Sequence, residues 1–127
     1  MTFSDLKKAD RDESMPKTYY LALDLKDDPA LIAEYEGYHR EIWPEIRDSI
    51  LAKGITGMEI YRTGNRLVMV MHTVPEFSFE EASRMDAANP VVAQWEELMW
   101  GFQQALPHAA TGQKWMLMEK VFDLSGQ

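Results

Sequence analysis

The sequence predicts an α+β domain whose elements follow the order β-α-β-β-α-β. Three observations indicate this order: an alternating apolar segment near the start, a hairpin signal in the middle, and two segments with the apolar spacing of amphipathic helices. A chain of 127 residues has the size of a single domain. We expect residues 1–16 to form a loosely ordered arm and residues 17–127 to form this domain.

The first predicted strand and helix lie next to each other in the chain. TYYLALDL, which begins at Thr18, alternates between two faces as a half-buried strand does. The DDP that follows is a helix start, with Asp28 as the N-cap and Pro29 at the first helical position. The helix is expected to run to about Lys53 and to end at Gly54, a residue type that favours the position after a helix.

The second half supplies a hairpin, a helical region and a last strand. ITGMEIYR and LVMVMH are predicted strands, and the TGNR between them has Gly64-Asn65 at the centre of a turn. Ser78 and Glu81 have the spacing of a capping box, and Asn89 followed by Pro90 starts another helix. LPHAATGQ is expected to be a loop, and KWMLMEKVFDL the last strand.

This order of elements gives a ferredoxin-like arrangement, with an antiparallel sheet covered by helices on one face. The other face would carry apolar side chains that are too numerous to leave in water. We expect a second copy of the chain to cover it, which predicts a homodimer. The methionines expected on that face are Met58, Met69, Met71, Met116 and Met118.

Composition and charge exclude several classes of function. The chain has no cysteine, which excludes disulfides and thiolate metal sites and fits a reducing, cytoplasmic compartment. Its formal net charge is −8 without a basic stripe, which argues against nucleic acid and anionic membranes as partners. No apolar run approaches the roughly 20 residues of a membrane span. The three histidines lack the short spacing of metal ligands.

The segment YEGYHREIWPEI departs from ordinary helix design in two ways. His39 lies near the centre of the apolar face of the first predicted helix, with Tyr35 one turn before it and Trp43 one turn after it. Pro44 cannot donate to the carbonyl of Arg40, at a cost of about 3 kcal/mol. A kink beyond His39 would open a pocket, although a core histidine bonded to a carbonyl or a tyrosine explains the ring equally well.

The same segment resembles the L-rhamnose mutarotase family, whose members share the pattern Y-x-x-x-H-x-x-I-W-P-E. The resemblance continues through GITGMEIYRTGNRLVMVM and NPVVAQWEELM and covers about residues 18 to 123. It implies a dimeric ferredoxin-like α/β barrel. It also implies an isomerase of the aldose 1-epimerase type, which interconverts the α and β anomers of a 6-deoxy-L-hexose without a cofactor or a metal.

The resemblance also implies roles for particular residues. The family's catalytic histidine falls on His39, and its sugar-contacting tyrosine falls on Tyr35. The rhamnose enzymes carry a binding tyrosine where this chain has Met58, and a tryptophan pair where it has Trp95 followed by Glu96. Because both differences fall at sugar-contacting positions, we expect L-fucose to be favoured over L-rhamnose.

Mutarotation removes a proton from the anomeric hydroxyl and delivers one to the ring oxygen, and a histidine with a pKa near the working pH suits such a step. The second proton carrier is open among Tyr35, a carboxylate such as Glu59, and water. Tyr61 is a further candidate contact of the sugar. Two other readings remain: a cofactor-free monooxygenase of the dimeric barrel type, and a non-catalytic dimer that binds a sugar or another metabolite.

Overall fold

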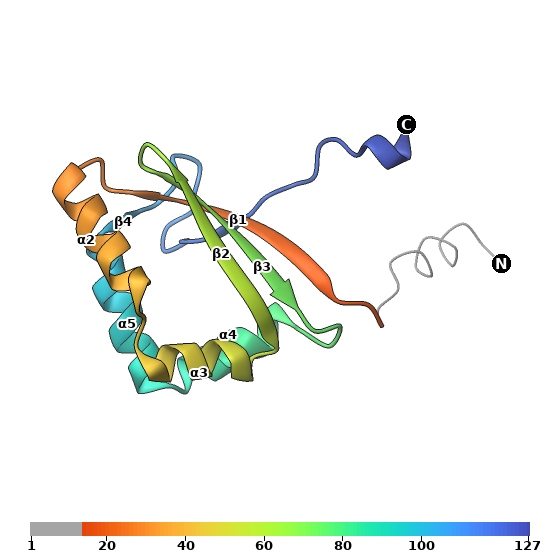
Figure 1. Cartoon of the computed structure of the whole chain (residues 1–127), viewed down its shortest axis with the longest axis horizontal. Coiled ribbons are helices and arrows are strands. Elements are labelled where there is room, and N and C mark those ends of the chain that lie inside the picture. Colours follow the sequence, from red (N-terminus) through yellow and green to blue (C-terminus); the bar gives the residue numbers. More distant parts are fainter. Residues whose placement is uncertain (1–13) are drawn as a thin grey trace.

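The computed structural model describes residues 14–127 and contains one antiparallel sheet with its helices gathered on one side (Figure 1). The sheet has the strand order β2-β3-β1-β4, and the short β5 also pairs with β1. This arrangement confirms the predicted α+β fold class. The arm expected at residues 1–16 lies almost wholly outside the described residues. The strands are β1 (Lys17–Leu25), β2 (Ile55–Thr63), β3 (Arg66–Thr73), β4 (Gln103–Gln104) and β5 (Met116–Leu117).

The helix starts predicted from the sequence are confirmed. An oxygen of Asp28 accepts hydrogen bonds from the next two free backbone N–H groups, at 2.9 and 3.2 Å. Asn89 does the same for the helix that begins at Pro90. The Ser78 hydroxyl accepts a bond from the Glu81 N–H, at 3.2 Å. The helices are α2 (Pro29–Arg40), α3 (Pro44–Ala52), α4 (Phe79–Ala87), α5 (Pro90–Trp100) and the 3₁₀ turn η1 (Leu124–Gly126).

The single kinked helix predicted over residues 28–53 is wrong, because the segment forms two helices. α2 ends at Arg40. Glu41 then has an extended backbone, and Trp43, with ψ 136°, is also non-helical before α3 begins at Pro44. A proline ring disfavours the helical conformation for the residue before it, and the same ring fits well at the first position of a helix. Pro44 therefore ends one helix and starts another instead of bending one.

The predicted placement of the methionines on the sheet is partly wrong. Met58, Met69 and Met71 face the helices and pack in the core. Met116 pairs with Ala22 and lies on the opposite, outer face of the sheet as predicted. Because β3 is apolar on both faces, its alternation alone does not identify the inner one. The outer face carries Tyr20, Ala22, Val68, Val70, Met116 and Met118.

The last predicted strand is much shorter than expected. Only Met116–Leu117 form β5, and the Met118 N–H still donates to the Tyr20 carbonyl at 2.8 Å. Beyond that point the chain leaves the sheet and runs outward to its end (Figure 1). The sequence predicted extended backbone, but a strand also needs a partner, and residues 119–123 pair with no strand among residues 14–127.

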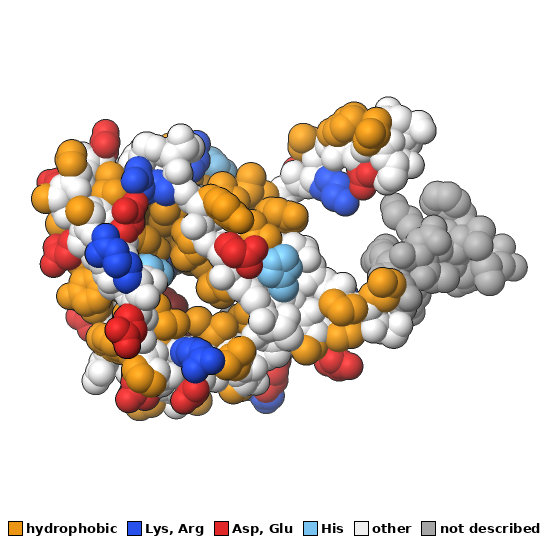
Figure 2. Space-filling view, in the orientation of Figure 1, with side chains coloured by type: hydrophobic (Ala, Val, Ile, Leu, Met, Phe, Trp, Pro, Cys, Tyr) orange, Lys and Arg blue, Asp and Glu red, His pale blue; other side chains and the backbone are white. Residues whose placement is uncertain are grey.

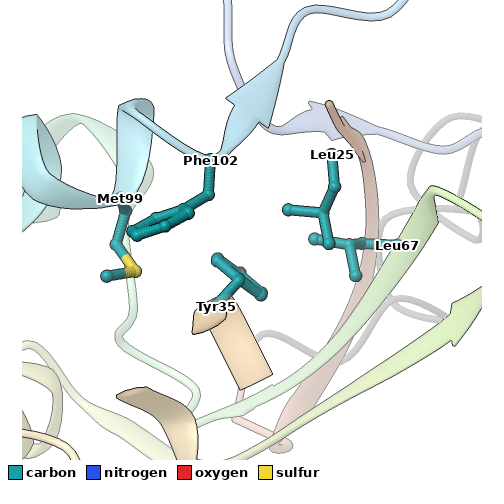
Figure 3. Packing of buried hydrophobic residues seen from close by; sticks show 5 residues of the cluster. All are labelled: Leu25, Tyr35, Leu67, Met99 and Phe102. Atoms are coloured by element: carbon teal, nitrogen blue, oxygen red, sulfur yellow. The ribbon is translucent and has the colours of Figure 1, made fainter. Parts of the chain in front are cut away.

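The core between sheet and helices consists of two clusters. One joins Tyr35 of α2 to side chains from both sheet and helix, as Figure 3 shows, and its buried members are Leu25, Tyr35, Leu67, Met99 and Phe102. The other contains Leu21, Ile55, Met71 and Phe77. Trp115 packs against both clusters. Among the described helices, none is long and apolar enough to cross a membrane.

Candidate active site

A cavity of about 890 Å³ lies between the sheet and the helices. Figure 2 shows the molecule hollowed in this region. The break between α2 and α3 forms part of the wall, because Glu41 and Ile42 line the cavity. Its volume falls within the range of small-molecule sites, which are typically about 300–1,000 Å³. Its polar, charged and aromatic lining residues include Tyr35, His39, Asp86, Trp95, Glu96, Gln103 and Lys114.

His39 lies in the last turn of α2 and is held by its own helix. Its Nδ1 lies 2.9 Å from the carbonyl oxygen of Tyr35. A carbonyl only accepts, so Nδ1 carries the hydrogen and the neutral ring keeps its lone pair on Nε2. Within residues 14–127, no protein group bonds Nε2, and no fully buried side-chain nitrogen or oxygen lacks a partner. Nε2 is therefore not fully buried, and His39 is one of the residues that line the cavity.

Aromatic rings surround His39. Its ring centroid lies 4.3 Å from that of Tyr35 and 5.7 Å from that of Trp95, and Trp43 in turn lies 5.1 Å from Trp95. Burial among these rings lowers the pKa of His39 below its ordinary value of 6.5, and the bond to the Tyr35 carbonyl partly opposes that shift. The ring is therefore neutral at neutral pH, ready to accept a proton at Nε2.

Tyr35 is almost fully buried, with 3% of its surface exposed, and yet it also lines the cavity. Burial raises the pKa of its hydroxyl to about 12, with a smaller opposing effect from a hydrogen bond to the Gln103 side chain. The hydroxyl therefore keeps its hydrogen throughout the neutral range. Sequence reasoning missed Gln103, because nothing in the local sequence distinguishes it from the exposed Gln104 beside it.

The structure brings three other predicted residues to the same cavity. Met58, Trp95 and Glu96 all line it. The Glu96 carboxylate lies 3.3 Å from Nζ of Lys114, which also lies 5.1 Å from the centroid of the Trp100 ring. Glu96 thus presents a paired, charged acceptor at the cavity wall, where an indole would offer mainly an apolar surface.

Tyr61 and Glu59 lie elsewhere. Tyr61 is 61% exposed and pairs with Val68 on the outer face of the sheet. Glu59 lies on that same face, where its carboxylate is 3.2 Å from Nε2 of His72. Neither residue lines the cavity. Glu59 of this chain is therefore not placed to exchange a proton with a ligand beside His39, and Tyr61 is not placed to contact one.

Across residues 14–127, no group of three or more histidine, aspartate or glutamate side chains is arranged to hold a metal ion. Two of the three acidic residues that line the cavity are instead paired with lysines. Asp86 lies 2.7 Å from Nζ of Lys53, and Glu96 is paired with Lys114 as described above. The chemistry that the site offers is that of a neutral imidazole, a protonated phenol, an amide and these ion pairs.

Comparison with known proteins identifies relatives along nearly the whole chain. The model of the L-rhamnose mutarotase family matches residues 18–124. An L-fucose mutarotase of Xanthomonas campestris is 46% identical over 114 residues, which cover 88% of this chain and 90% of the relative. An L-rhamnose mutarotase of Phocaeicola vulgatus is 28% identical over 79 residues, covering 62% of this chain and 74% of the relative.

A solved structure agrees with the fold. The crystal structure of an L-rhamnose mutarotase from Formosa agariphila superposes with a TM-score of 0.63 and covers 85% of this chain and 98% of its own. At 18% sequence identity this likeness supports the fold alone.

Proposed function

Because this chain belongs to the L-rhamnose mutarotase family, we propose that it is an isomerase that interconverts the α and β anomers of a 6-deoxy-L-hexose. The observation that carries the proposal is His39, which lines an aromatic-walled cavity of about 890 Å³ and whose Nε2 has no hydrogen-bond partner among residues 14–127. His39 is also the histidine of the Y-x-x-x-H-x-x-I-W-P-E segment, whose first tyrosine, Tyr35, supplies the carbonyl that orients the ring.

The reaction requires two proton transfers and one bond cleavage. A base removes the proton of the anomeric hydroxyl, the bond between the anomeric carbon and the ring oxygen breaks, and the ring oxygen gains a proton. The open aldehyde turns about its bond to the next carbon, and closure on its other face gives the other anomer. His39 is the base, because its lowered pKa leaves Nε2 unprotonated at neutral pH.

The demand on the catalyst is modest, so a few groups suffice. Sugars already exchange their anomers in water without a catalyst, and one positioned acid or base contributes about 10²–10⁴-fold. The aromatic walls hold the apolar side of the sugar. The paired Glu96 and the other polar groups at the cavity are available to bind its hydroxyls.

L-Fucose is the proposed preferred sugar. The L-fucose mutarotase of Xanthomonas campestris is more similar to this chain than the L-rhamnose enzyme of Phocaeicola vulgatus, by identity and by coverage. The two residues at which this chain departs from the rhamnose pattern, Met58 and Glu96, both line the cavity. The two sugars differ in the configuration of the hydroxyls at two ring carbons. A change in the cavity side chains that contact these hydroxyls therefore affects the preference between L-fucose and L-rhamnose.

Saturation-difference proton NMR at equilibrium tests the reaction on L-fucose and L-rhamnose. One anomeric proton is irradiated in the presence of catalytic protein, and transfer of saturation to the other anomer measures exchange. Wild type should accelerate transfer, more for L-fucose, and His39→Asn should abolish the acceleration. His108→Asn is the matched control, because His108 is exposed and outside the cavity. A folded wild type that accelerates neither sugar would exclude this reaction for both.

We also propose that the active form is a cytoplasmic homodimer. Its support is the apolar outer face of the sheet together with the outward-running C-terminal segment. In that segment Val121 is 93% exposed, and Phe122 and Leu124 are largely exposed too. A second copy would cover both surfaces at once. In analytical ultracentrifugation wild type should sediment as a dimer and Phe122→Asp should weaken it; a wild-type monomer at micromolar concentration would exclude the dimer.

A further inference from the structure

The cavity is much larger than the sugar that the proposed function requires. Its volume is about 890 Å³. Even if each non-hydrogen atom of a 6-deoxyhexose took the roughly 30 Å³ of a water molecule in the liquid, one sugar would fill well under half of that space. Sites for small molecules usually enclose most of the surface of their ligand. The cavity thus has room for a further part of the ligand, beyond the unit that reacts at His39.

The cavity extends along α3 to a second group of polar side chains. His39 lies in the last turn of α2, whereas Lys53 directly follows α3, and Figure 1 shows α3 running away from the end of α2. The nine residues of α3 span about 13 Å at 1.5 Å per residue. Because Ile46, Ile50 and Lys53 all line the cavity, it follows α3 over most of that length. A single pyranose ring is shorter than this span, so a ring beside His39 leaves the Lys53 end unoccupied.

Lys53 and Asp86 form an ion pair at that end of the cavity. Nζ of Lys53 lies 2.7 Å from Oδ1 of Asp86, the Lys53 side chain is only 11% exposed, and both residues line the cavity. Ser83 lies three positions before Asp86 on the same helix, α4, and lines the cavity too. Desolvation offsets much of the attraction between two buried charges, so an apolar pair of similar size would serve packing equally well. The stability of the fold alone does not explain the pair.

The pair favours a neutral ligand that carries hydroxyl groups. An ammonium has three hydrogens to donate and a carboxylate has two oxygens that accept, so the bond between them leaves capacity on both. Within residues 14–127, neither charged group has a second hydrogen-bond or ion-pair partner. A hydroxyl can donate to the carboxylate and accept from the ammonium, whereas a phosphate would have to compete with Asp86 for Lys53. Much of the remaining lining is apolar, including Ile50, Met69 and Phe77, which suits the C–H faces of a sugar.

We propose that Lys53, Asp86 and Ser83 form a second subsite that binds the hydroxyls of a second sugar unit, so that the protein accepts reducing disaccharides with a 6-deoxy-L-hexose at the reducing end. This inference rests on the proposed function, which places the reducing unit at His39. Mutarotation needs a free anomeric hydroxyl, and a second unit attached through another hydroxyl leaves it free. The bonds made and broken are those of the proposed reaction, and the second unit contributes binding alone.

Two isomers of L-fucosyl-L-fucose, linked to O3 and to O4 of the reducing unit, test the inference against L-fucose in the NMR exchange assay. Saturation is transferred between the anomeric protons of the reducing unit, over a range of sugar concentrations. For at least one isomer, the KM of wild type should be about tenfold lower than for L-fucose, and kcat should be similar. Hydrogen bonds to charged groups far from the reacting bond strengthen the binding of substrate and transition state alike.

Variants of the ion pair test which residues bind the second unit. Lys53→Met/Asp86→Leu removes both charges without leaving either one unpaired, so the chain should still fold. The ratio of kcat/KM for the disaccharide to that for L-fucose should fall about tenfold in this variant, through KM and not kcat. Asp86→Asn, which keeps the shape of the side chain, should lower the same ratio. Circular dichroism and melting curves establish that each variant is folded.

Glu81→Gln is the matched control for these variants. Glu81 lies on α4 as Asp86 does, but it pairs with Arg84 at the exposed surface and does not line the cavity. Its replacement should leave the ratio unchanged.

The outcomes separate the subsite from the reaction. A wild type that exchanges L-fucose but neither disaccharide, or that has a higher KM for both disaccharides than for L-fucose, would overturn the inference and leave the proposed function standing. A preference for a disaccharide that persists in folded Lys53→Met/Asp86→Leu would overturn the assignment of the subsite to this pair. A wild type that exchanges none of the three sugars would overturn the proposed function and the inference with it.

Discussion

Replacing Gly54 with alanine tests how tightly the turn after α3 is built. Gly54 has φ +89°, and its N–H and carbonyl bond Leu51 and Val74 respectively. A Cβ added at Gly54 would lie 2.8 Å from Cγ2 of Val74. Alanine there therefore meets two penalties, a left-handed backbone and a contact far inside the 3.5–4.0 Å or so that carbon atoms prefer.

The size of each penalty follows from a matched control. Gly64 also has a left-handed backbone, φ +57°, but nothing lies within 4 Å of an added Cβ. Gly64→Ala should cost only the backbone term, about 1–2 kcal/mol, less a few tenths gained from a stiffer unfolded chain. Gly54→Ala should cost that amount plus about 1–3 kcal/mol for overpacking against Val74.

Urea unfolding of the four variants measures both terms. Val74→Ala alone loses packing, but in the double variant Gly54→Ala/Val74→Ala it removes the close contact. The double variant should therefore be more stable than the two single losses added together, by about 1 kcal/mol or more. Equal losses for Gly54→Ala and Gly64→Ala, or strict additivity in the cycle, would refute the contact as the reason that Gly54 is glycine.

Further predictions concern His39 and the pair of Lys53 and Asp86. Asp86→Ala leaves the ammonium of Lys53, whose side chain is 11% exposed, without its partner at 2.7 Å, and it should lower the free energy of unfolding in urea by about 1–3 kcal/mol. Adding Lys53→Met should recover part of this loss. The exchange rate should rise with pH through a His39 pKa that lies below the ordinary histidine value of 6.5, as NMR from acid to neutral pH would test. Because the His39 pKa is lower in the folded than in the unfolded chain, the unfolded chain binds more protons as the pH falls below 6.5, and the free energy of unfolding should decrease on acidification. His39→Asn should make this decrease smaller, as urea midpoints measured across that pH range would show.

Features decided by a few neighbouring residues were predictable from the sequence. Asp28 and Asn89 cap helices because their side chains bond N–H groups two and three positions ahead. Gly54 and Gly64 have the left-handed backbones that their places at a helix end and in a hairpin turn require. The antiparallel sheet followed from the order of these elements, because short connections allow few topologies.

Features decided across the fold were not predictable in the same way. β3 reads LVMVM, so both of its faces are apolar, and only the strands and helices around it place Met69 and Met71 inside. Gln103 and Gln104 are neighbouring residues of the same type, and only the packing of β4 against β1 buries Gln103 and leaves Gln104 exposed. The candidate site divides in the same way. His39 and Tyr35 share one helix and were predicted together, while Gln103, which lines the same cavity, lies 68 residues beyond Tyr35 in the chain.

The break at Pro44 explains how one segment can supply both a catalytic side chain and a wall. A continuous helix from Pro29 to Ala52 would be about 36 Å long at 1.5 Å per residue, longer than the roughly 30 Å span of a nine-residue strand. It would extend past the sheet that it covers. Ending α2 at Arg40 instead lets α3 take a different direction, visible in Figure 1, and bring Ile46 and Ile50 to the cavity. Pro44, which would be costly inside a helix, thus separates α2 from α3 and leaves room for the cavity that His39 lines.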